Sequence, residues 1–121
     1  MGSHSSRLTG PIQVLARIVA AWGLTSEECA ALLDYTHAGE AENLLNGRLT
    51  LRGRDREERV RQIFAIHAVL KALFQNPETE PLWLRAASPD LSGLSPLAFM
   101  IERGLLGMVI VRNVVDRIAG R

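Results

Sequence analysis

Apolar residues recur at steps of three and four positions along most of this chain, and that spacing predicts helices that each bury one face. The first stripe runs from about Pro11 to Trp22 and ends at Gly23. A second helix is expected after Thr25, because Thr25 and Glu28 have the spacing of a capping box, in which each side chain accepts a backbone N–H near the helix start. This helix should stop near Asp34.

A third, shorter helix should follow the connection Tyr35-Thr36-His37 and end at Leu45, where Asn46-Gly47 supplies a left-handed stop. Asn-Gly is also a hairpin signal, and Arg48-Leu-Thr-Leu51 alternates briefly, so a β-hairpin is an alternative for this stretch. Two short helices joined by a tight connection, after a longer first helix, favour a helix-turn-helix module.

The longest apolar stripe predicts a central helix from Asp55 to about Gln75, with Asp55 and Glu58 as a second capping box. It should end before Pro77, because a residue that precedes proline is disfavoured in helical geometry. Apolar side chains cover much of its circumference, which places it between two layers or at a subunit interface. They are Val60, Ile63, Phe64, Ile66, Val69, Leu70, Leu73 and Phe74.

The last third of the chain predicts two helices separated by a glycine. Ser95 is a natural N-cap, and Pro96 suits the first helical position, where a missing N–H has no intrahelical partner to lose. Gly104 should end the first of these helices. The second presents one apolar stripe, made of Met108, Val111, Val115 and Ile118.

Together these elements predict an all-α fold with four parts. Residues 1–10 are expected to be a tag remnant or disordered, and residues 11–54 a helix-turn-helix module. Residues 55–76 form the long central helix, which joins that module to a small C-terminal helical domain, residues 77–121.

Composition narrows the class of protein. The 121 residues carry a net charge of +1, which neither requires nor excludes a nucleic-acid partner. The charge is uneven, because the segment from Arg48 to Arg61 holds six arginines against three acidic residues. The single cysteine, Cys29, excludes an internal disulfide and suits a cytoplasmic protein. We count no apolar run of about 18 residues, so we expect no membrane partner.

Motifs that carry catalysis are missing from the sequence. It contains no glycine-rich phosphate loop, no His-Glu-x-x-His motif, no Cys-x-x-Cys pair and no Gly-x-Ser-x-Gly elbow. His67 has no second ligand type at a metal-binding spacing, so we expect it to be a satisfied core or interface residue. The chain is therefore predicted to act by binding, not as an enzyme, with no cofactor and no metal.

The helix-turn-helix prediction carries candidate DNA contacts. Asn43 and Asn46 could read base edges, because an amide pairs bidentately with adenine. Glu40 and Glu42 on the same helix would repel phosphates. Three arginines just beyond the helix could hold the DNA backbone: Arg48, Arg52 and Arg54. The alternative is a helical hairpin that only packs.

The C-terminal third resembles the Xre/MbcA/ParS antitoxins, which pair with RES-domain toxins. The resemblance rests on three stretches: Pro89-x-Leu91-x-Gly93-x-Ser95-Pro96-Leu97, Gly107-Met-Val109 and Val115-Asp-Arg-Ile118-x-Gly120. The N-terminal Leu24-Thr-x-Glu-Glu28 is similar to the opening of the family's Xre-like helix-turn-helix.

The resemblance implies an antitoxin of a type II toxin–antitoxin system. Its partner would be a RES-domain toxin that consumes NAD, and residues 77–121 would be the toxin-binding domain, whose last helix masks the NAD cleft. Members of the family commonly form homodimers, and some repress their own operon by binding operator DNA. The residues implied in toxin binding are Ser95, Pro96, Leu97, Met108, Arg112, Val115, Arg117, Gly120 and Arg121.

Arginines near the chain end are compatible with this role, because a guanidinium pairs bidentately with a carboxylate on a partner. The alternative is that Arg112, Arg117 and Arg121 are solvated positions of an amphipathic helix. Two other functions also fit the sequence. One is an orphan helix-turn-helix DNA-binding transcriptional regulator with a C-terminal dimerisation module, and the other is a plain helical adaptor.

Overall fold

The architecture of residues 10–120 comes from a computed structural model, and predictions for residues 1–9 and Arg121 lie outside this described part. No strand occurs within it, so the all-α prediction is confirmed and the hairpin alternative at residues 48–51 is wrong. The elements are α2 (Pro11–Ala21), α3 (Ser26–Leu32), α4 (Ala38–Leu45), α5 (Arg54–Leu73), α6 (Thr79–Arg85), the 3-10 helix η1 (Pro89–Leu91) and α7 (Pro96–Ile118).

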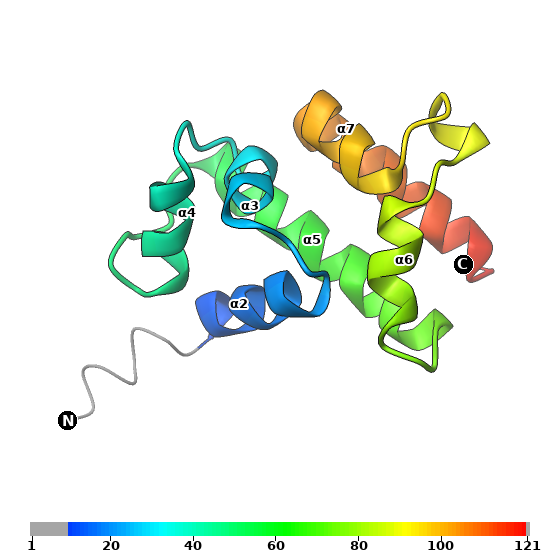
Figure 1. Ribbon diagram of the computed structural model, residues 1–121, viewed down its shortest axis with the longest axis horizontal. Helices are drawn as coiled ribbons and strands as arrows, with labels where there is room; N and C mark the ends of the chain where they lie inside the picture. Colours follow the sequence, from blue (N-terminus) through cyan, green and yellow to red (C-terminus); the bar gives the residue numbers. More distant parts are fainter. Residues whose placement is uncertain (1–9, 121) are drawn as a thin grey trace.

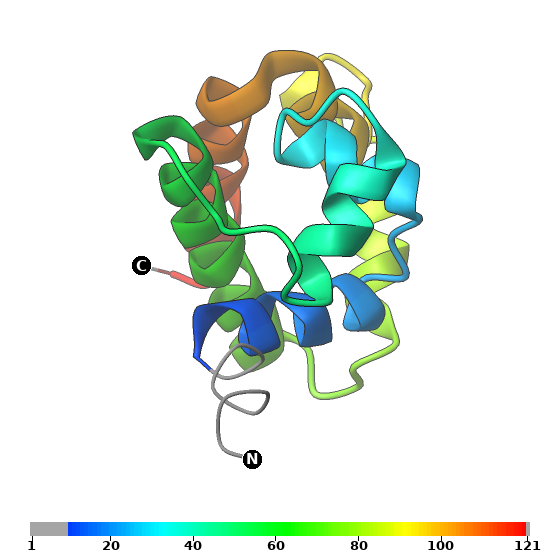
Figure 2. The same cartoon turned by 90° about the vertical axis from the view of Figure 1, so that its left-hand side faces the viewer.

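The long helix α5 runs through the middle of the molecule, as its apolar circumference predicts (Figure 1). In Figure 2, α5 and the later part of α7 stand together on one side, α3 and α4 lie on the other, and α2 crosses below. The first part of α7 reaches across the top to α3. One cluster of buried side chains draws on every helix. It includes Leu15, Leu32, Leu44, Ile66, Leu84, Leu91 and Met100.

Local signals placed most of the helix starts. The capping box of α3 is confirmed, since Thr25 Oγ1 accepts the Glu28 N–H at 3.0 Å and Glu28 Oε1 accepts the Thr25 N–H at 2.9 Å. A capping hydrogen bond at the start of α4 was not predicted: the His37 N–H donates to Glu40 Oε1 at 3.0 Å.

The predicted second capping box, at the start of α5, is wrong. The helix begins at Arg54, one residue earlier than expected, with Gly53 as N-cap at φ 95°. Asp55 is therefore already helical and cannot cap. Its carboxylate instead pairs with Arg59 at 2.7 Å, and that of Glu58 pairs with Arg61 at 2.8 Å.

The glycine break in the last third is confirmed. Ser95 caps α7, with its Oγ accepting the Ala98 N–H at 3.1 Å, and Gly104 then leaves helical geometry at φ 64° and ψ −140°. The helix continues at a new angle from residue 105 to Ile118. The positive φ favours glycine there, and a Cβ would also lie 3.0 Å from Nη2 of Arg59, which would have to move slightly.

One expectation about hydropathy needs correction. The segment Pro89–Ile118 is long and apolar enough to cross a membrane by length and composition. In the structure this segment bends at Gly104 and buries Met100, Met108 and Val115 completely. Part of its apolar surface therefore belongs to the protein core.

Candidate functional site

The second segment of α7, residues 105–118, has one buried and one exposed face. Met108, Val111 and Val115 are 0% exposed and pack in the core. On the opposite side, three- and four-residue steps bring together an exposed stripe that we call the terminal face. It consists of Leu106, Val109, Asn113 and Arg117.

The terminal face combines apolar area with positive charge. Leu106 is 65% exposed and Val109 is 37% exposed, so this side of the helix carries apolar area that the core does not bury. Arg117 lies in the last turn, where the helix dipole favours a cation. Arg112 borders this face and is 4.0 Å from Asp116, a separation that leaves its guanidinium available to a stronger partner.

At the end of α7 the apolar stripe that faces the core continues onto a residue that the core no longer covers. Ile118 follows Val111 and Val115 at helical spacing, yet it is 52% exposed. Gly120 follows at φ 78° and is also exposed. The helix therefore ends in an apolar tip beside the basic turn of Arg117.

The structure separates the predicted toxin-binding residues into two groups. Three members are exposed: Arg112, Arg117 and Gly120. The Ser95 hydroxyl instead caps the start of α7. The other described members are buried and shape the domain from inside: Pro96, Leu97, Met108 and Val115. Arg121 lies outside the described residues. Leu106 was not among the predicted toxin-binding residues, and the signal that could have found it is an apolar residue off the core stripe.

The arginine-rich segment 48–61 is also divided by the structure. Arg56 turns inward, donating from Nε to the Leu33 carbonyl at 2.9 Å and from Nη2 to the Asp34 carbonyl at 2.7 Å. Its guanidinium also lies 4.0 Å above the ring of Tyr35. Arg56 therefore caps the carboxyl end of α3, where unpaired carbonyls favour a cation.

Arg59 continues this cap by donating from Nη1 to the Leu32 carbonyl at 3.1 Å. Arg61 pairs with Glu58. Within residues 10–120, the arginines of this segment that lack an acidic or carbonyl partner are those predicted to hold DNA phosphates. They are Arg48, Arg52 and Arg54, and all are exposed.

The predicted base-reading residues Asn43 and Asn46 are exposed at α4. Glu40 holds the His37 N–H, so that carboxylate is partly committed to the start of α4. Glu42 is exposed beside Asn43. The exposed surface of α4 therefore carries the amides of Asn43 and Asn46 beside the carboxylate of Glu42. The first exposed arginine after the helix is Arg48.

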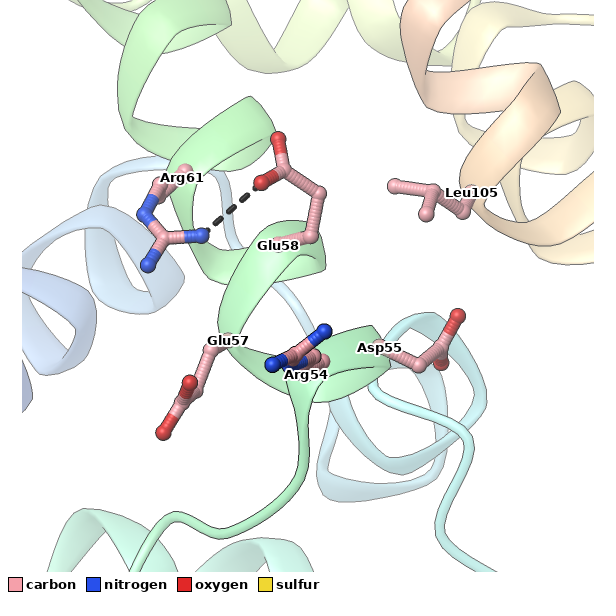
Figure 3. Close-up of a pocket in the computed structure, with 6 residues that line it drawn as sticks. All are labelled: Arg54, Asp55, Glu57, Glu58, Arg61 and Leu105. Carbon is pink, nitrogen blue, oxygen red and sulfur yellow. Dashed lines mark hydrogen bonds and ion pairs between the residues drawn. The ribbon is translucent and has the colours of Figure 1, made fainter.

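Near the start of α5 a hollow of about 490 Å³ lies between that helix and Leu105 of α7 (Figure 3). Its rim carries both signs of charge, from the two arginines Arg54 and Arg61 and the three acidic residues Asp55, Glu57 and Glu58. Since Asp55 and Glu58 are already paired, the hollow has no excess of either sign to bind an ion. No group of three potential metal ligands occurs anywhere in residues 10–120.

Glu28 ties the two halves of the chain together. Arg85 of α6 donates to both of its carboxylate oxygens at 2.8 Å and to the Gly23 carbonyl at 2.9 Å. The bond from Arg85, aided by the cap bonds at Thr25, lowers the pKa of Glu28 to about 2. Thus α6 is fixed to the loop that opens α3.

A second tie is buried and was not predicted. Glu80 of α6 is 3% exposed, and its Oε1 accepts Trp22 Nε1 at 3.0 Å and lies 2.9 Å from His67 Nδ1. The expectation that His67 is a satisfied residue is confirmed by this contact. Glu80 gave no sign of burial, because a glutamate in a first helical turn is normally solvated.

Comparison with known families identifies the C-terminal part. Residues 69–121 match the family described as antitoxin Xre/MbcA/ParS C-terminal toxin-binding domain. The match spans the end of α5, α6, η1 and the whole of α7, including the terminal face. Searches of curated proteins and of solved structures gave no match.

Proposed function

Since residues 69–121 belong to the Xre/MbcA/ParS family of antitoxin toxin-binding domains, we propose that this chain is a type II antitoxin that inhibits a RES-domain toxin. The resemblance seen in the sequence is thereby confirmed for that part of the chain. The proposed toxin degrades NAD, and the antitoxin blocks its NAD cleft by covering it.

The observation that carries the proposal is the terminal face on a family-matched helix. Leu106 and Val109 provide exposed apolar area of the kind that anchors an interface core. Arg112 and Arg117 flank it with guanidinium groups suited to carboxylates. A cleft that binds a pyrophosphate is itself positive, so we expect these arginines to meet acidic residues at its rim.

The test is co-purification with the toxin encoded beside this chain, and survival of cells that express both. Leu106→Glu with Val109→Glu should weaken binding by about 30-fold or more, because charge enters the interface core. Arg112→Gln with Arg117→Gln should weaken it less. The side chains involved are exposed, so unchanged thermal unfolding verifies the fold of each variant.

The matched control is Leu82→Glu, which places a charge on an apolar side chain of α6 that is 71% exposed. It should neutralise toxin as wild type does. Truncation at Gly104 is a poor test, because it removes Met108, Val111 and Val115 from the core. If the Leu106/Val109 variant folds and still neutralises, the terminal face is not the toxin-binding surface.

We also propose that the helix-turn-helix module binds operator DNA and represses the chain's own operon. The supporting observation is that Arg48, Arg52 and Arg54 stay exposed while Arg56 and Arg59 turn inward. DNA binding should weaken with salt by about one log-log unit for each phosphate contact. Arg52→Glu with Arg54→Glu should abolish binding, and no binding at low salt would contradict the proposal.

The two activities can be separated in one experiment. The Arg52/Arg54 variant should lose DNA and keep toxin, whereas the Leu106/Val109 variant should lose toxin and keep DNA. If the first variant alone is defective and no toxin is bound by wild type, the chain is an orphan DNA-binding regulator. If wild type binds neither, it is a helical adaptor.

We further propose that the chain acts in the cytoplasm as a homodimer. Cys29 is buried, and burial raises the pKa of its thiol to about 11, so it suits a structural role that needs no disulfide. A dimer would present two α4 helices to symmetric half-sites. Sedimentation of the free chain at several concentrations tests this, and a monomer at all of them would contradict it.

A further inference from the structure

Two adjoining hollows lie between α2 and the carboxyl-terminal half of α5. Each has a volume of about 380 Å³, within the range of small-molecule sites. They share Arg17, His67 and Lys71 as lining residues, so the three basic side chains stand where the hollows meet. We call this continuous depression the α2–α5 groove.

The basic side chains converge from two helices. His67 and Lys71 are four residues apart on one face of α5, and Arg17 comes from α2. Arg17 and Lys71 are exposed, and neither has an acidic partner within residues 10–120. Two permanent positive charges therefore face the same depression without compensation from an ion pair.

His67 is held in position from behind by the buried carboxylate of Glu80. His67 Nδ1 is 2.9 Å from Glu80 Oε1, and Trp22 Nε1 donates to the same oxygen at 3.0 Å. The edge of Trp22 packs against the imidazole, with ring centroids 6.3 Å apart. The contact with Glu80 engages Nδ1, which leaves Nε2 as the ring nitrogen that can meet a ligand.

The carboxylate of Glu80 does not cancel the positive character of the groove. It is 3% exposed and is occupied by two donors from other helices. Its effect on the groove is to orient the His67 ring. The two unpaired cations and the half-buried histidine can together hold an anion through charge-assisted hydrogen bonds.

Most of the remaining wall is apolar, and Gln75 and Glu80 are the other polar lining residues, both in the hollow with Phe74. Phe64 and Ile18 line one hollow, and Phe74 and Pro77 line the other. Phe64 and Phe74 are both partly buried, so their rings are fixed by the core. A ligand that fills the groove should therefore combine a compact anionic group with a flat or apolar body.

We propose that the α2–α5 groove binds a small phosphate ester with a flat apolar group, such as a nucleoside monophosphate. The phosphate lies between Arg17, Lys71 and His67, and the apolar body rests along one of the phenylalanine-lined hollows. This proposal is independent of the toxin-binding and DNA-binding functions, since it uses none of their residues.

The experiment is isothermal titration of the full chain with adenosine 5′-monophosphate, adenosine and inorganic phosphate. The monophosphate should bind, adenosine should not, and inorganic phosphate should bind at least about tenfold more weakly. Arg17→Ala with Lys71→Ala should weaken monophosphate binding by about tenfold or more, because two charge-assisted contacts are lost. His67→Gln should weaken it by a smaller factor.

The charge-matched control is Arg61→Ala with Arg103→Ala, which removes two positive charges outside the groove and should leave binding unchanged. The proposal is overturned by no binding of the monophosphate, by equal binding of inorganic phosphate, or by equal losses in both double variants. It is also overturned if duplex DNA displaces the monophosphate and the Arg17/Lys71 variant loses DNA, since the groove is then a DNA phosphate contact.

Discussion

The arginine-rich start of α5 and the terminal face of α7 use similar residues in opposite ways. At α5, Arg56 and Arg59 turn inward and close the carboxyl end of α3. At α7, Arg112 and Arg117 stay outside, and the inward face is wholly apolar. The difference shows that a cluster of charge in a sequence need not be a cluster of charge on a surface.

The sharpest test of the division within α7 is truncation of one side chain on each face. Met108→Ala should lower the free energy of unfolding by about 2–5 kcal/mol, because Met108 is 0% exposed and leaves a cavity. Leu106→Ala, at 65% exposure, should change it by less than about 0.5 kcal/mol. Urea denaturation measures both, and similar values would mean that the faces are wrongly assigned.

The bend of α7 depends on close packing that a second pair of variants can probe. A Cβ on Gly107 would lie 2.8 Å from the Phe99 carbonyl oxygen, so Gly107→Ala should cost about 1–3 kcal/mol. Gly39→Ala in α4 meets nothing within 4 Å and should be neutral or stabilise by up to about 1 kcal/mol. Thermal unfolding compares them, and a harmless Gly107→Ala would show that the two segments are not pressed together.

The inward and outward arginines of α5 should differ in stability effect. Arg56→Ala removes two bonds to the Leu33 and Asp34 carbonyls and should cost about 1–2 kcal/mol. Arg54→Ala, on an exposed side chain, should stay within about 0.5 kcal/mol of wild type but weaken DNA binding. A larger loss of unfolding free energy for Arg54→Ala than for Arg56→Ala would contradict the assignment of Arg56 as the inward arginine.

The smallest expected effect concerns the Glu28–Arg85 tie. The pKa of Glu28 is lowered to about 2, so the folded state binds fewer protons than the unfolded state between that value and the ordinary 4.5. The stability from this pair is therefore present above about pH 4.5 and is lost as the pH falls toward about 2. Arg85→Gln should cost about 0.5–1 kcal/mol at pH 7, because solvent screens the partly exposed pair.

The control for that prediction is the pH dependence itself. Wild type and Arg85→Gln should converge in stability as the pH approaches about 2, as measured by urea denaturation. A gap that is constant with pH would mean that the bond from Arg85 to the Gly23 carbonyl, rather than the ion pair, is what stabilises the fold.

Most of the fold was predictable because its signals are local. The Thr25 and Ser95 caps and the Gly104 break each depend on residues within a few positions, and all three are observed. The wrong prediction of a cap at Asp55 also concerns neighbouring residues. Gly53 is the N-cap, so the helix begins one residue earlier than expected, and the spacing of Asp55 and Glu58 does not reveal that shift.

The candidate sites were less predictable because they depend on distant segments. Arg56 is inward only because the end of α3 lies against α5, a contact across 23 residues. Glu80 is buried only because Trp22, 58 residues away, offers an indole N–H. Helical periodicity predicts that Met108 packs in the core, where it cannot contact a toxin. Only the resemblance to the antitoxin family linked this residue to toxin binding.

The bend at Gly104 has a consequence for how this surface can change. The backbone angle of Gly104 sets where the second segment starts, and the terminal face begins two residues later. One inserted or deleted residue between them would turn every later side chain by about 100° and shift it by about 1.5 Å along the axis. Substitutions can therefore alter what the face recognises, whereas changes in length would point it away from its target altogether.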